Sequence, residues 1–96
     1  MRPSEALQSN RAAVREIALR CRVSNVRVFG SVLRGEDTEE SDLDLLVDPT
    51  ADTTLLDIAR IQNRLQKLLG VTVDVLTPRV LPESFRERVL SEAVPV

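Results

Sequence analysis

Apolar residues recur at helical spacing in two long stretches of the chain. The first predicts a single helix over residues 1–22, with Ser4 as its N-cap. The second predicts a helix over residues 53–69, closed by Gly70, with Asp57 facing solvent in its first turn. The apolar faces consist of Leu7, Val14, Ile17, Ala18 and Cys21 in the first helix, and of Leu55, Ile58, Ile61, Leu65 and Leu68 in the second.

Three shorter runs, at residues 26–29, 43–47 and 71–76, have the β-branched content and alternation of strands. A short helix is expected between Gly30 and Gly35, and a last one after Pro82, with Phe85 and Val89 turned inward. Helices that separate short strands predict an α/β fold, in which a small mixed sheet is flanked by helices.

Two carboxylates interrupt the apolar pattern of the second predicted strand. Asp42 and Asp44 are two residues apart, so both side chains leave the same face, whereas Leu43 and Leu45 leave the other. Aspartate is uncommon inside strands, which makes this acidic face unusual. Such a pair can hold metal ions that neutralise a polyphosphate and activate a hydroxyl group.

The turn after the first predicted strand has the residues of an anion site. Gly30 permits a sharp turn or a close approach of the backbone to a ligand, and Ser31 stands where a helix begins, with a hydroxyl and free N–H groups. Arg34 either neutralises a phosphate or ties the turn to the acidic loop, and the sequence leaves both interpretations open. The loop itself, residues 36–40, is interpreted as a solvated connection.

These residues together resemble a known family. Gly30-Ser31, ten intervening residues and Asp42-x-Asp44 are similar to the signature of the nucleotidyltransferase superfamily that includes DNA polymerase beta. Arg34-Gly35 and the run Ser41–Val47 resemble, more narrowly, the minimal nucleotidyltransferases (MNT). Many of these are antitoxins paired with HEPN-domain toxins.

The resemblance implies a third carboxylate on a neighbouring strand, for which Asp74 is the only strand candidate. It further implies that Asp42, Asp44 and Asp74 bind two Mg²⁺ ions and carry the catalysis, that Gly30, Ser31 and Arg34 bind phosphate, and that ATP is the donor. The implied partner and acceptor is a HEPN toxin, modified on a tyrosine hydroxyl. This chain contains no tyrosine, so such an acceptor must belong to another protein.

Two other functions stay open at this point. An antitoxin of this fold can neutralise its toxin by binding alone, although the three aspartates argue against that interpretation. A nucleotidyltransferase can also act on a small molecule or on RNA. With 96 residues, the chain is expected to form one minimal nucleotidyltransferase domain over residues 1–96, without room for a separate substrate domain.

Composition narrows the function classes. There are 13 basic and 15 acidic residues, which argues against direct nucleic-acid binding. No apolar run is long enough for a membrane span, and the lone Cys21, interpreted as a core residue, is consistent with a cytoplasmic location. The absence of histidine excludes a Ser-His-Asp triad and leaves carboxylates as general bases. The apolar tail 93–96 either packs on its own sheet or contacts a partner.

Overall fold

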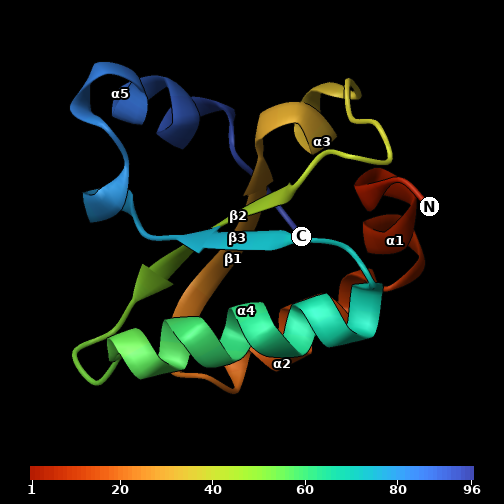
Figure 1. Ribbon diagram of the computed structural model, residues 1–96. Coiled ribbons are helices and arrows are strands. Elements are labelled where there is room, and N and C mark those ends of the chain that lie inside the picture. The colour runs from red at the N-terminus through yellow and green to blue at the C-terminus, as the bar shows by residue number, and fades with distance from the viewer.

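A computed structural model describes all residues 1–96 (Figure 1). The helices are α1 (Pro3–Ser9), α2 (Arg11–Leu19), α3 (Gly30–Arg34), α4 (Leu55–Leu69) and α5 (Glu83–Glu92), with a 3-10 turn η1 (Pro78–Val80) before α5. The strands are β1 (Val23–Phe29), β2 (Leu43–Pro49), β3 (Val73–Leu76) and β4 (Val94–Pro95).

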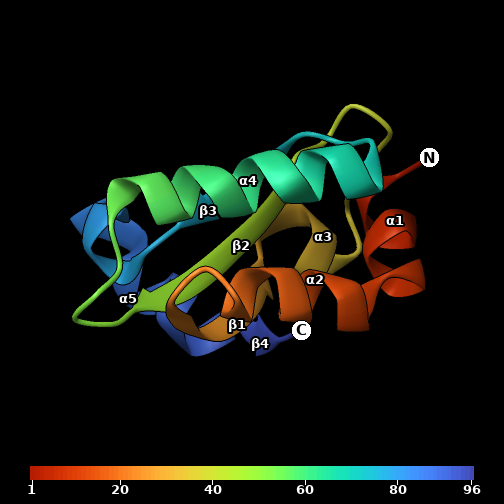
Figure 2. The ribbon, with the colours of Figure 1, turned by 90° about the horizontal axis from the view of Figure 1, so that it is seen from below.

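The strands form one mixed sheet of order β3-β2-β1-β4. Strand β2 runs parallel to β3 and antiparallel to β1, and β4 pairs antiparallel with the other side of β1. Helices α2 and α4 lie on one face of the sheet and α5 on the opposite face, while α3 continues directly from the end of β1 (Figures 1 and 2). The predicted α/β fold with a mixed sheet is therefore confirmed.

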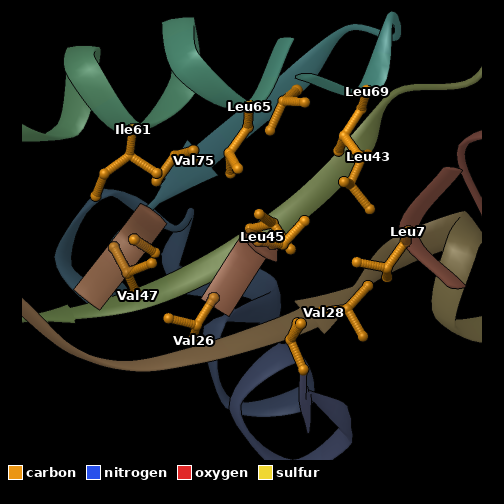
Figure 3. Close-up of a cluster of buried hydrophobic side chains, with 14 of the residues drawn as sticks. Leu7, Val26, Val28, Leu43, Leu45, Val47, Ile61, Leu65, Leu69 and Val75 are labelled. Atoms are coloured by element: carbon orange, nitrogen blue, oxygen red, sulfur yellow. The ribbon is translucent and has the colours of Figure 1, made fainter. Parts of the chain in front are cut away.

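The main core lies between the sheet and helices α1, α2 and α4 (Figure 3). There, Leu43, Leu45 and Val47 of β2 meet Ile61 and Leu65 of α4, and all five are fully buried. Each such side chain stabilises the fold by about 1.5–3 kcal/mol relative to exposure. A smaller cluster covers the α5 face of the sheet and consists of Phe29, Leu46, Leu81 and Val89. At Leu46, β2 is therefore also covered on the face opposite the main core.

The N-terminal segment is two helices, so the prediction of one helix over residues 1–22 was wrong. The chain breaks at Asn10, whose backbone leaves the helical region and whose side-chain amide donates to the carbonyl oxygen of Ala6 at 2.9 Å. Asparagine competes for backbone groups in this way and favours helix ends. Ser4 is not an N-cap either. It lies inside α1, and its N–H donates to the distant Asp37.

Helix α4 differs from its prediction at both ends. Leu55 is 87% exposed and Leu68 is 42% exposed, whereas Leu69 is buried. Asp57, predicted to face solvent, is buried because it forms a capping box with Thr54: its Oδ2 accepts from the Thr54 N–H at 2.9 Å, and its own N–H donates to the Thr54 hydroxyl at 3.2 Å.

At the C-terminal end, the inward position of Val89 is confirmed, but Phe85 is 38% exposed. The tail packs on its own sheet. Pro95 lies opposite Arg27 in the β1–β4 ladder, the Val96 N–H donates to the Val26 carbonyl at 3.0 Å, and Val96 is buried. None of the helices has the length and apolar character needed to cross a membrane.

Candidate active site

The pairing register brings the predicted site residues to one place on the sheet. Asp44, in the central strand β2, lies opposite Phe29 of β1 on one side and opposite Asp74 of β3 on the other. Gly30 follows Phe29 directly and begins α3. The end of β1, the start of β2 and the start of β3 therefore lie side by side. This arrangement brings Gly30, Asp44 and Asp74 together.

Gly30 is required by the close approach of Asp44. Its φ is +76°, a region that favours glycine, and a Cβ built there would stand 2.4 Å from Oδ2 of Asp44. The sequence predicted a sharp turn or a close approach at this glycine. The positive φ confirms the turn, and the group that a side chain at this position would meet is the carboxylate of Asp44.

The electrostatic environment of Asp44 is strongly unfavourable to its charge. Burial of the half-buried carboxyl, followed by the negative charges of Asp74 and Asp42, raises the pKa of Asp44 from 3.8 to about 6, and only Arg34 opposes this. Asp74 is half-buried on its strand, whereas Asp42 is exposed and lies one residue before β2. The negative charges of Asp74 and Asp42 therefore both act on Asp44.

Ser31 and Arg34 are both in α3. Ser31 is half-buried in the first turn, and α3 has no side-chain N-cap, so its first backbone N–H groups are not occupied by a capping oxygen. Arg34 is 46% exposed and its Nε lies 3.3 Å from Glu36 Oε1. Of the two roles left open for Arg34, the structure shows the ion pair to the acidic loop, while its charge also acts on Asp44.

The implied magnesium ions require oxygen ligands. No group of three Asp, Glu or Cys side chains stands close enough to form a ready-made metal cage. The donor chemistry nevertheless fits, because carboxylate oxygens are the ligands that Mg²⁺ prefers. Burial is the main cause of the raised pKa of Asp44, and the charges of Asp74 and Asp42 add to it; a bound cation would offset both effects. Asp42, Asp44 and Asp74 are the residues that would hold such ions.

Sequence reasoning missed Asp37. It lies in the loop interpreted as solvated, yet it is only 5% exposed, and its Oδ2 accepts from the Ser4 N–H at 2.9 Å. That hydrogen bond is the first cause of the lowered pKa of Asp37. It ties the loop between Ser31 and Asp42 to α1, across 33 residues of sequence. No local pattern could have indicated this contact.

A groove at the edge of the sheet lies apart from the predicted site. It has a volume of about 420 Å³ and runs along the β1–β4 edge, between Arg15 and Leu19 of α2 and the tail residues Pro95 and Val96. It includes none of the three aspartates and offers no carboxylate for proton transfer or metal binding. We therefore assign the candidate site to the Gly30–Asp44–Asp74 junction on its chemistry.

Comparison with known proteins decides the family. A family model of the nucleotidyltransferase domain matches residues 10–96, nearly the whole chain. The chain belongs to the nucleotidyltransferase family. The matched region includes every predicted site residue, from Gly30 to Asp74, so the resemblance inferred from the Gly-Ser turn and the spaced aspartates is confirmed for the family.

Relatives of this nucleotidyltransferase place it among small members of the family. The protein adenylyltransferase MntA of Thermococcus cleftensis is 38% identical over 80 residues, covering 83% of this chain and 81% of that protein. The chain is also similar to a solved structure described as a minimal nucleotidyltransferase, with a TM-score of 0.86 at 49% identity. The match covers 97% of this chain and 95% of that one.

A more distant structural match shows the fold alone. It is a chain in the complex of a tri-AMPylated Shewanella oneidensis HEPN toxin with an MNT antitoxin. Its TM-score is 0.68 at 16% identity, and the match covers 92% of this chain and 69% of that one.

Proposed function

We propose that this protein transfers AMP from ATP to a hydroxyl group, most favourably a tyrosine hydroxyl, of a partner HEPN toxin and thereby acts as its antitoxin. The observation that carries the proposal is the junction of Gly30, Asp44 and Asp74, where a backbone turn suited to phosphate meets a cluster of carboxylates. The similarity to an adenylyltransferase and the fold shared with an MNT antitoxin support AMP as the transferred group and a HEPN protein as the acceptor.

In the proposed reaction the acceptor oxygen attacks the α-phosphorus of ATP. A new phosphorus–oxygen bond to the acceptor forms, the bond between the α-phosphorus and the β-bridging oxygen breaks, and pyrophosphate leaves. Two Mg²⁺ ions held by the aspartates would neutralise the phosphates and lower the pKa of the acceptor hydroxyl. Asp74 takes the acceptor proton or anchors the group that does. Gly30 and Ser31 hold the phosphates through backbone N–H groups and the serine hydroxyl, so that catalysis is mainly positioning and charge neutralisation.

A binding-only antitoxin is the second candidate. It needs only a surface that blocks the toxin, and the groove along the β1–β4 edge offers a surface separate from the carboxylates. The energetic cost of gathering three aspartates argues against it, because an antitoxin that only binds gains nothing from the raised pKa of Asp44.

The decisive experiment combines the protein, labelled ATP, Mg²⁺ and a HEPN protein encoded by a neighbouring gene. We expect label on the HEPN protein, stable to hydroxylamine as a phosphodiester to a hydroxyl would be, and at most weak label on this chain alone. Asp42→Ala and Asp74→Asn should abolish transfer. Asp48→Asn is the matched control, because Asp48 lies on the same strand as Asp44 but pairs with Arg27, and transfer should persist.

The outcomes separate the candidates. Unchanged transfer by a folded Asp42→Ala protein would refute the two-metal interpretation. Asp74→Asn keeps Asp44 and the phosphate turn and should still bind Mg–ATP and the partner. If that variant neutralised the toxin fully in cells while transferring no AMP in vitro, the binding-only function would replace the enzymatic one.

A further inference from the structure

The outer edge of strand β3 is closed by two glutamines of α4. Gln66 Oε1 accepts from the Val73 N–H at 3.1 Å, and Gln62 Oε1 accepts from the Val75 N–H at 3.2 Å. The two side chains leave α4 one turn apart, so one helix face serves two successive outward amides. Figures 1 and 2 show α4 running alongside β3 in both views.

The residue between these two amides is Asp74. Successive residues of a strand direct their backbone groups to opposite edges, and the Leu43 N–H donates to the Thr72 carbonyl at 2.9 Å. The backbone groups of residues 72 and 74 therefore face β2, whereas those of 73 and 75 face outward. Asp74 is held against Asp44 on one edge, and its two neighbours are held by the glutamines on the other.

Strand β3 needs such support because of where it lies. It is an edge strand of four residues, and its only strand partner is β2, which runs parallel to it. Parallel pairing is slightly weaker per residue, and an open edge invites fraying or pairing with another chain. The valine side chains are buried in the core under α4, so packing holds the strand near the sheet, while the two amide hydrogen bonds set its backbone.

We propose that Gln62 and Gln66 are positioning residues for Asp74: by accepting from the amides on either side of it, they keep its carboxylate in register beside Asp44. The catalytic half of this inference rests on the proposed function, in which Asp74 acts on the acceptor side. Each glutamine contributes only an acceptor oxygen to its hydrogen bond. A substitution should therefore be tolerated when the new side chain keeps an acceptor oxygen at this place. Glutamate should replace either residue, whereas methionine, of similar size but without a strong acceptor, should not.

The first test measures the strand directly and does not depend on activity. In the wild-type protein the Val73 and Val75 amides should be protected from hydrogen exchange, although they lie on a sheet edge. Gln66→Met should speed exchange at Val73 by roughly tenfold, as the loss of one hydrogen bond implies, and Gln66→Glu should restore protection. Asn63→Met, at an exposed position of the same helix, is the matched control and should change neither amide.

The second test measures the consequence for transfer with the HEPN partner. The variants Gln62→Met and Gln66→Met are made singly, so that each keeps the other glutamine's hydrogen bond. Each should lower kcat by roughly tenfold and leave KM for ATP nearly unchanged. The Glu variants should recover kcat. A purely structural role would lower the melting temperature but leave kcat unchanged wherever the variant is fully folded, and that result would overturn the positioning role.

The two tests distinguish failure of this inference from failure of the proposed function. Absence of transfer by the wild type would refute the function but leave the exchange result standing. Rapid hydrogen exchange of both amides in the wild type, or unaltered exchange in the Met variants, would refute the positioning role of the two glutamines. This conclusion would hold whatever the transfer activity. Should a Met variant fail to fold, the wild-type exchange and the Glu variants still decide.

Discussion

Replacing Asp44 with asparagine should stabilise the apoprotein, because the native fold opposes the charge of this carboxylate. Its pKa is about 6 in the folded protein against an ordinary value of 3.8. That difference corresponds to about 3 kcal/mol if fully expressed. The carboxyl is only half-buried, so solvent screening reduces the expected gain at neutral pH to about 1–2 kcal/mol. Asparagine keeps the shape of the protonated carboxyl and removes its charge.

The sign of the effect gives a characteristic pH dependence. Above about pH 6 the wild-type carboxyl is charged in both states, and the full penalty is present. Between about pH 6 and about pH 4 the folded protein takes up a proton that the unfolded chain does not, so the penalty shrinks. Below the unfolded value of 3.8 both states are protonated, and the advantage of Asp44→Asn should vanish.

Urea unfolding at a series of pH values, with a chelator to exclude divalent metals, measures this difference. Asp48→Asn is the matched control on the same strand and should lose stability, by about 1–3 kcal/mol. Its carboxylate lies 2.5 Å from the Arg27 Nη2 and accepts from the Asn25 amide at 2.7 Å. Equal stability of Asp44→Asn and wild type at neutral pH, or an advantage that grows as the pH falls, would refute the electrostatic reasoning.

Three further predictions concern the framework of the site. Gly30→Ala should cost at least about 1 kcal/mol more in urea unfolding than Gly35→Ala, because both glycines have positive φ but only the added Cβ at Gly30 meets a side chain, that of Asp44. Thr54→Ala should lower the stability of the protein by about 1 kcal/mol, visible in thermal melts followed by circular dichroism, because it removes the N-cap of α4. The pKa of Asp37 is lowered chiefly by its hydrogen bond to the α1 backbone, so the stability it contributes is complete above its unfolded pKa and is lost as the pH falls through the folded value. Asp37→Asn should therefore flatten the acid limb of a pH–stability curve, whereas an unchanged limb would show that this bond contributes nothing.

Sequence reasoning predicted the elements whose signals are local. The three strands β1, β2 and β3, the helix α4 and the Gly-Ser turn before the paired aspartates each follow from residues within a few positions of one another. The errors include the break at Asn10 inside the predicted first helix and several residues near the ends of helices. Leu55 is exposed because it lies in the first turn of α4, and Asp57 is buried because it caps that helix. Helical periodicity indicates which residues share a face of a helix. It does not indicate at which residue that face stops contacting the sheet.

The sequence by itself indicated the family, through a Gly-Ser turn, the spaced pair Asp42 and Asp44, and the later Asp74. Only the tertiary structure decided how these parts meet. The β1–β2–β3 register places Asp44 between Gly30 and Asp74, and this crowding both requires the glycine and raises the carboxyl pKa. Such contacts join residues tens of positions apart, and their energies depend on burial and on distances between charges, neither of which a local pattern contains.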